Sequence, residues 1–158
     1  MSFPRMLPKT NPSDPQLFST VTISAPIRVV FDVITDLELF AELDPPVLSC
    51  EITSQHKRGL GVTSHWVAIS DDQSKQIEWD EEIIHYLSPH QYAFRVTQGE
   101  EVYEGVHTLT ENADATVTIE FWETFHFAVD VSKRQQSIDA LLNNTKREAE
   151  ARARGSRP

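Results

Sequence analysis

The sequence predicts an α+β fold in which one long C-terminal helix lies across a curved antiparallel sheet. Residues 18–127 consist mostly of segments in which apolar and polar residues alternate, as in strands with one buried face. Residues 132–152 instead carry apolar side chains at helical spacing and contain no proline. Side chains cannot fill the space between a long helix and a strongly curved sheet everywhere, so we expect a cavity there.

The chain is expected to form a single domain, because its 158 residues are about the length of one compact core. Residues 1–17 contain four prolines and little periodicity, which predicts an extended, poorly ordered arm. We place the domain at residues 18–152 and a disordered tail at residues 153–158.

The first part of the domain is predicted to be a strand followed by two short helices. Residues 18–24 alternate as the strand, and Pro26 suits the first turn of a helix. The apolar stripe of that helix is Ile27, Val30, Phe31 and Ile34. Asp36 is a good N-cap for a second helix over residues 37–43, which a Pro-Pro pair ends.

Six further strands are predicted before the long helix. They are residues 47–53, 61–70, 76–86, 91–96, 102–110 and 116–127. Ser132 stands three residues before Gln135, the spacing of a capping box, so the final helix is expected to begin there. Its apolar stripe is Ile138, Leu141, Leu142, Thr145 and Ala149.

Composition excludes several classes of function. The formal net charge of −10 argues against a nucleic-acid surface, which needs clustered Lys and Arg. No run approaches the roughly 18 apolar residues of a membrane span, and the first ten residues lack the apolar region of a secretory signal. A single cysteine, Cys50, fits a reducing compartment, so we expect a cytoplasmic protein.

Three segments resemble the START-like, or SRPBCC, superfamily. VTISAPIRVVFDVITDLELFAEL resembles its opening, GLGVTSHW its Gly-x-Gly strand entry, and EEIIHYLSPHQYAFRV its central hairpin. The subgroup most similar is that of polyketide cyclases/dehydrases and lipid transport. The resemblance implies a helix-grip fold: a seven-stranded curved antiparallel sheet wrapped around the C-terminal helix, with two short helices between strands 1 and 2. It does not specify an activity, because the superfamily includes cyclases, lipid carriers, hormone receptors, pollen-allergen-type binders and chaperone activators.

Strand alternation and this resemblance together predict which side chains face the cavity. The third strand should contribute Val62, Ser64, Trp66 and Ala68, the fourth Trp79, Glu81, Ile83 and His85, and the fifth Tyr92, Phe94 and Val96. The last strand should contribute the odd-numbered residues from Val117 to Phe127. Tyr103, His107 and Leu109 share one face of the sixth strand, and the sequence leaves open which face it is.

The candidate catalytic residues are Glu81, His85, His107 and Glu123. Desolvation among aromatic side chains raises the pKa of a carboxyl and can leave a histidine poised for proton transfer. Glu81 and His85 stand four residues apart on one strand, so we expect them on the same face. The alternative is that Glu81 and Glu123 lie at strand ends or pair with Arg95 or a histidine on the convex face. His65 and His126 have the opposite parity and should be exposed to solvent.

The candidate ligand-binding residues are the inward-facing set from the sheet and the final helix. They are Ser64, Trp66, Trp79, Ile83, Tyr92, Phe94, Tyr103, Phe121, Phe125, Ile138, Leu141 and Leu142.

No metal and no cofactor are expected. The six histidines form no HExxH motif, the lone Cys50 offers no CxxC motif, and there is no GxSxG elbow. Gly59-Leu60-Gly61 lacks the rest of a dinucleotide fingerprint, and Cys50 fits a small apolar strand residue better than a nucleophile.

Three functional hypotheses follow. The first is a carrier that binds a hydrophobic or aromatic small molecule between sheet and helix. The alternative is a cofactor-independent cyclase, aromatase or dehydratase that uses the inward Glu and His side chains. The third is a module that binds a partner protein through its outer face, and a homodimer also remains open.

Overall fold

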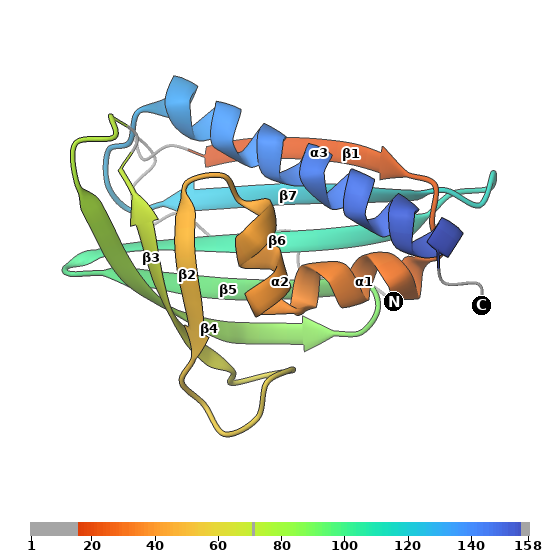
Figure 1. The fold of residues 1–158 in the computed structure, drawn as a ribbon, viewed down its shortest axis with the longest axis horizontal. Coiled ribbons are helices and arrows are strands. Elements are labelled where there is room, and N and C mark those ends of the chain that lie inside the picture. Colours follow the sequence, from red (N-terminus) through yellow and green to blue (C-terminus); the bar gives the residue numbers. More distant parts are fainter. Residues whose placement is uncertain (1–15, 71, 156–158) are drawn as a thin grey trace.

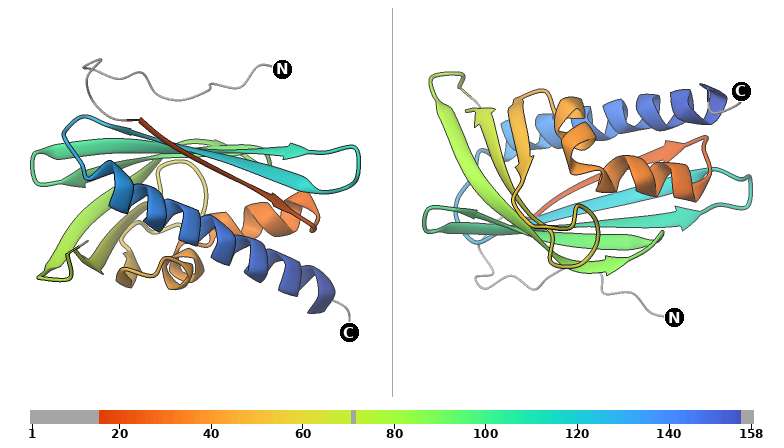
Figure 2. Two further views of the ribbon diagram at one scale, coloured as in Figure 1. Left: turned by 90° about the horizontal axis from the view of Figure 1, so that it is seen from above. Right: turned by 60° about the horizontal axis from the view of Figure 1, so that its bottom comes forward.

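The computed structural model describes residues 16–70 and 72–155. Within them the elements are β1 (Gln16–Ile23), α1 (Ile27–Thr35), α2 (Leu37–Leu43), β2 (Val47–Ile52), β3 (Thr63–Ile69), β4 (Gln76–Leu87), β5 (Gln91–Gln98), β6 (Glu101–Glu111), β7 (Val117–Phe125) and α3 (Val131–Gly155). The seven strands form one antiparallel sheet in the order β1-β7-β6-β5-β4-β3-β2. The sheet curves around α3, with the helices on its concave side (Figures 1 and 2). This is the helix-grip architecture that the sequence predicts.

The two short helices close one end of the curved sheet. The predicted stripe of α1 is buried, and Asp36 caps α2 by accepting the backbone N–H of Leu39 at 3.3 Å. Pro45 and Pro46 end α2 and lead into β2, because proline cannot continue the hydrogen bonding of a helix. These helices fix the position of the α2–β2 turn, which borders the cavity described below.

The final helix differs from its predicted bounds at both ends. Its N-terminal turn is capped by Asp130, whose Oδ1 accepts the backbone N–H of Lys133 at 3.1 Å, and Ser132 is not the cap. Gln135 does not complete a capping box and instead donates to the carbonyl oxygen of Phe18 at 2.8 Å. Residues 153–155 continue the helix rather than starting a tail. At the other terminus, β1 already begins at Gln16, and the rest of the predicted arm lies outside the described residues.

The register settles which face of β6 is inward. His107 pairs with Phe121, and Tyr103 pairs with Phe125, both on the apolar register of β7. The ring of His107 stacks on Phe121 at 4.1 Å and on Tyr92 at 4.7 Å between centroids. These three rings form a continuous aromatic row across β5, β6 and β7 on the concave face.

Candidate functional site

A small inner cavity of about 40 Å³ lies between the concave face of the sheet and helices α2 and α3. Its wall is lined by Leu37, Phe40, Asp44, Trp66, Trp79, Glu81, Tyr92, Phe94, Tyr103, Phe121, Glu123, Arg134 and Leu141. Seven of the predicted ligand-binding residues and two of the predicted catalytic residues are in this set. A space of this size holds only a water molecule or a small polar group.

A larger outer cavity of about 200 Å³ lies next to the inner one. Four residues line both cavities: Asp44, Trp79, Tyr103 and Arg134. The rest of the outer wall includes Phe125, Phe127, Val129 and Asp130. The two cavities therefore form one candidate site with mostly apolar and aromatic walls, in which the outer part has room for an apolar body and the smaller inner part holds Glu81, Glu123 and the shared Asp44 and Arg134.

A buried ion pair spans the site from sheet to helix. Arg134, in the first turn of α3, donates from Nε to Glu123 Oε1 at 2.7 Å and from Nη2 to Oε2 at 2.5 Å. The Glu123 side chain is fully buried, and that of Arg134 is about one-fifth exposed. Such a bidentate pair satisfies the carboxylate geometrically and holds the start of α3 over β7.

Glu81 is the second carboxyl of the inner cavity. It is half-buried on β4 and accepts a hydrogen bond from Trp79 Nε1 at 2.9 Å. Burial raises the pKa of Glu81 to about 8, the Trp79 hydrogen bond opposes the shift, and the charges of Glu123 and Asp44 add to it. Glu81 is therefore mostly protonated at neutral pH and can donate as well as accept a proton.

Asp44 is the third carboxyl, and it follows α2 as its C-cap. Burial raises the pKa of Asp44 to about 6, although the charge of Arg134 lowers it. Its Oδ1 atom is buried and has no hydrogen-bond partner in the described part of the chain. A helix C-terminus carries partial negative charge, so it offers this carboxylate no compensation.

His85 does not face the cavity, contrary to the sequence prediction. A β-bulge at Ile84 breaks the alternation: Ile83 pairs with Phe94, and His85 then pairs with Ala93. Paired residues in an antiparallel sheet share a face, so His85 is on the convex face with Ala93 while Glu81 and Ile83 are inward. The expected Glu81–His85 pair is therefore not formed.

His107 faces inward but lies behind the cavity wall. Its ring is completely buried between Tyr92 and Phe121, and neither nitrogen has a hydrogen-bond partner among residues 16–70 and 72–155. Burial lowers the pKa of His107 to about 3. The imidazole is therefore neutral at physiological pH and supports the aromatic wall without reaching the cavity.

The remaining predicted ligand-binding residues are placed as follows. Trp66 stacks on Trp79 with ring planes 8° apart and centroids 6.0 Å apart, and its Nε1 donates to Ser64 Oγ at 2.8 Å. Phe125 lines only the outer cavity. Ser64, Ile83, Ile138 and Leu142 are buried but line neither cavity, so they position its wall.

The sequence analysis did not identify two residues of the site, Arg134 and Asp44. Arg134 stands four residues before Ile138, so it extends the inward stripe of α3 by one turn. A buried carboxylate such as Glu123 also needs a cationic partner, which Arg134 provides. That signal was available. Asp44 lies in a turn, where neither strand nor helix periodicity indicates a direction.

The convex face carries its own polar pairs. Glu104 accepts from Arg95 at 3.3 Å and lies 2.8 Å from His126 Nε2, so His126 is largely buried and not exposed as predicted. His65 is partly exposed between Asp80 and Glu78, at 2.8 and 3.0 Å. Because Arg95 binds Glu104, it is not the partner of Glu81 or Glu123.

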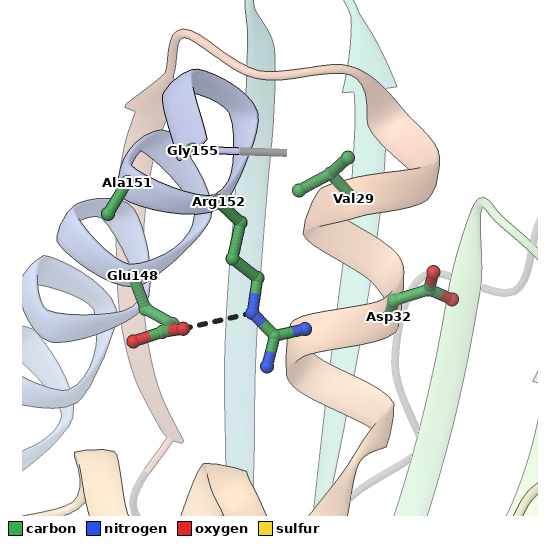
Figure 3. Close-up of a pocket in the computed structure, with 6 residues that line it drawn as sticks. All are labelled: Val29, Asp32, Glu148, Ala151, Arg152 and Gly155. Atoms are coloured by element: carbon green, nitrogen blue, oxygen red, sulfur yellow. Dashed lines mark hydrogen bonds and ion pairs between the residues drawn. The ribbon is translucent and has the colours of Figure 1, made fainter. Parts of the chain in front are cut away.

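A third hollow, of about 490 Å³, is an open groove on the surface between α1 and α3. Figure 3 shows Arg152 extending across it, with its Nε bonded to Glu148 at 2.9 Å. Val29, Asp32, Ala151 and Gly155 form the rest of its lining. The groove contains no aromatic side chain from the described residues and is open to solvent, so it is a weaker candidate for a small-molecule site than the cavities under α3.

Two absences within the described residues bear on the site. In the part of the chain that the structure describes, no three His, Cys, Asp or Glu side chains are grouped closely enough to hold a metal ion. None of the described helices has the length and hydrophobicity to cross a membrane.

Comparison with known proteins shows the same fold in several solved structures. Residues 16–151 match the family model described as "Polyketide cyclase / dehydrase and lipid transport". A protein of Thermus thermophilus has 20% identity and a TM-score of 0.73, covering 87% of this chain and 98% of its own. The Zhui aromatase/cyclase of a Streptomyces species has 20% identity and a TM-score of 0.71, covering 90% and 98%. A START superfamily protein of Mycobacterium smegmatis has 12% identity and a TM-score of 0.66, covering 89% and 98%. No curated protein matches the chain.

Proposed function

Because the chain belongs to the polyketide cyclase/dehydrase and lipid transport family, we propose that it binds a hydrophobic or aromatic small molecule between the sheet and α3. The observation that supports this proposal is the pair of adjacent cavities walled by Trp79, Tyr103 and other aromatic side chains. Apolar walls with a few convergent polar groups are typical of small-molecule sites.

The outer and inner cavities would hold different parts of the ligand. The outer cavity offers the rings of Tyr103, Phe125 and Phe127, which already contact one another at 4.7 to 6.4 Å between centroids. An apolar body in contact with these rings would remove its own surface and theirs from water. The inner cavity offers Glu81, Asp44 and the Glu123–Arg134 pair, so a small polar group at one end of the ligand would fit there.

Tryptophan fluorescence provides a direct test. The chain has three tryptophans, of which Trp66 and Trp79 line the inner cavity, whereas Trp122 contacts Phe18 on the convex face. In a Trp122→Phe background, 2-naphthol should quench the remaining emission with saturable binding. Trp79→Ala should weaken the affinity for 2-naphthol, measured calorimetrically, by at least about tenfold, whereas Trp122→Phe should leave it within about twofold. Equal effects of the two substitutions would overturn the proposal.

Proton transfer on an enolisable ligand is the second candidate function. It is favoured by one observation: Glu81 lies in the cavity with its pKa raised by burial to about 8, where both protonation states are accessible. In D₂O near neutral pD, the protein should then catalyse exchange of the α-hydrogens of 2-tetralone, followed by NMR. Glu81→Gln should slow this exchange about a hundredfold and leave affinity within a few-fold. A protein that binds 2-tetralone without catalysing exchange acts as a carrier.

A further inference from the structure

The wall of the inner cavity contains more acidic than basic groups. Asp44, Glu81 and Glu123 line it from the α2–β2 turn, β4 and β7, and Arg134 is the single cationic side chain among its described lining residues. Arg134 donates its two hydrogen bonds, from Nε and Nη2, to Glu123. Asp44 and Glu81 are thus left without a basic partner within ion-pair distance in the described chain.

These two carboxyls also have unused hydrogen-bonding capacity. Asp44 Oδ1 is buried and has no partner among the described residues, although it lines both cavities. Glu81 has one bond to its Oε2 atom, from Trp79. A buried acceptor without a donor costs free energy, so a ligand that brings N–H donors to this point would recover it.

A metal ion is a poor candidate for this surplus of acidic groups. The three carboxyls come from separate elements, and within residues 16–70 and 72–155 no three His, Cys, Asp or Glu side chains are grouped closely enough to hold a metal ion. The surrounding rings favour an organic cation instead. Trp66 and Trp79 stand beside Glu81, and Tyr103 borders Asp44 in both cavities. Aromatic faces attract ammonium groups, and the attraction grows as the pair loses its contact with water.

The size of the two cavities fixes an orientation for such a ligand. About 40 Å³ in the inner cavity suits an ammonium group and not a ring, whereas about 200 Å³ in the outer cavity suits an aromatic body. We propose that the site takes a hydrophobic or aromatic ligand bearing a protonated amine, with the ammonium in the inner cavity beside Glu81 and Asp44. This inference rests on the proposed function and names its ligand class.

Binding of a cation should be linked to loss of a proton. The titratable or charged groups facing Glu81 and Asp44 are Glu123, Arg134, Tyr103 and Tyr92 in the inner cavity, Asp130 in the outer cavity and Cys50 on β2. The Cys50 thiol is neutral, because burial raises its pKa to about 12. Burial holds the pKa of both tyrosines well above its ordinary value, so they stay neutral. Glu123 and Arg134 balance each other, and Asp44, with its pKa at about 6, is already mostly ionised above that pH, so the further charge that attracts the ammonium comes from ionisation of Glu81, whose pKa is about 8. The affinity for the ammonium should therefore rise as pH increases from about 6 to about 8.

Three ligands of the same size test the proposal: 2-naphthylmethylamine, 2-naphthylmethanol and 2-naphthoate. Calorimetry with the full chain should show the amine binding at least about tenfold more tightly than the alcohol at about pH 8, and the carboxylate most weakly. The preference for the amine should fall at least about fivefold between pH 8 and pH 6. Titrations in buffers of different ionisation enthalpy should show release of up to about one proton per amine bound.

Matched amide substitutions assign the effect to the inner cavity. Glu81→Gln and Asp44→Asn should each reduce the preference for the amine over the alcohol, while alcohol affinity stays within a few-fold. Glu82→Gln, an exposed neighbour on β4, should change the affinity for neither ligand. Circular dichroism identifies a variant that fails to fold, in which case the other variant and the pH dependence decide.

The outcomes separate this inference from the proposed function. Binding of the alcohol as tightly as the amine would overturn the inference and leave the proposed function standing. Strongest binding of 2-naphthoate would also overturn it and would identify Arg134 as the anchor. If none of the three ligands binds, both the inference and the proposed function fail.

Discussion

At the residue scale, Glu81 makes the stability of the protein depend on pH. Burial raises its pKa from 4.5 to about 8 in the folded state, so its contribution to stability is fully present below pH 4.5 and is lost as pH rises through about 8. The Glu81→Gln variant should lose less stability than wild type as pH rises. Urea unfolding should show the variant gaining about 2 kcal/mol relative to wild type between pH 5 and pH 9.

The control for this measurement is Glu82→Gln, which changes an exposed carboxyl on the same strand. It should retain the wild-type pH profile. A Glu81→Gln profile parallel to wild type across this range would show that Glu81 is already ionised in the folded protein. That result would also remove the basis for proton transfer by this residue.

His107 should make the stability of the protein decrease as pH falls, whereas Glu81 makes it decrease as pH rises. Burial lowers its pKa from 6.5 to about 3, so its contribution to stability is present above pH 6.5 and is lost as pH falls through about 3. His107→Phe should keep the ring stacking and remove two unpaired buried nitrogens. We expect the variant to gain about 1–2 kcal/mol over wild type between pH 7 and pH 5. The partly exposed His65→Gln serves as the control, and an equal gain there would contradict the assignment.

Individual residues also show why only part of the site could be predicted. Glu81 and Glu123 were placed correctly because strand alternation fixes the face wherever pairing is regular. His85 was misplaced because the bulge at Ile84 shifts the parity, and nothing local in the sequence marks that bulge. Asp44 belongs to a turn, so its direction depends on tertiary packing that periodicity does not encode.

At the element scale, the wall of the inner cavity depends on how closely the Phe94 side chain of β5 approaches the backbone of β6. Phe94 on β5 pairs with Gly105 on β6. A Cβ atom at position 105 would lie 2.8 Å from Phe94 Cε1 and 3.1 Å from Phe121 Cε1. The glycine therefore lets the Phe94 ring lie flat over β6 and line the inner cavity, which is a reason for glycine in the middle of a strand.

Gly105→Ala should accordingly displace Phe94 and destabilise the protein by about 1–3 kcal/mol. It should also weaken binding of 2-naphthol, because the displaced ring enters the cavity. Thermal and urea unfolding of the double variant Gly105→Ala/Phe94→Leu provide the check: the alanine should cost less stability when the Phe94→Leu substitution is already present. Additive costs would show that the two residues do not interact.

The elements themselves were easier to predict than their ends. Alternation over β4 to β7 and the stripe of α3 are long, so each strand and helix was found within a few residues. The capping box failed because Asp130, two residues earlier, offers a competing cap. A cap depends on the approach of the preceding chain, which for α3 is set by the end of β7.

At the whole-molecule scale, the inner cavity, the outer cavity and the surface groove compete for a ligand, and hydrogen exchange can tell them apart. A ligand under α3 would connect the start of that helix to the sheet, because Arg134 and Leu141 line the inner cavity together with Tyr103 and Phe121. Saturating 2-naphthylmethylamine should therefore slow amide exchange in residues 131–145 and in β4 to β7. At about 100 times its dissociation constant, the ligand should stabilise the fold by about 2.7 kcal/mol.

The open groove gives the contrasting result, because it lies at the other end of α3 between Glu148 and Gly155 and against α1 (Figure 3). Protection confined to residues 148–155 and to α1 would place the ligand there and would contradict a site under the helix. Tyr103→Ala, which alters only the inner and outer cavities, should abolish the protection near Arg134. Arg152→Ala, which alters only the groove, should leave it unchanged.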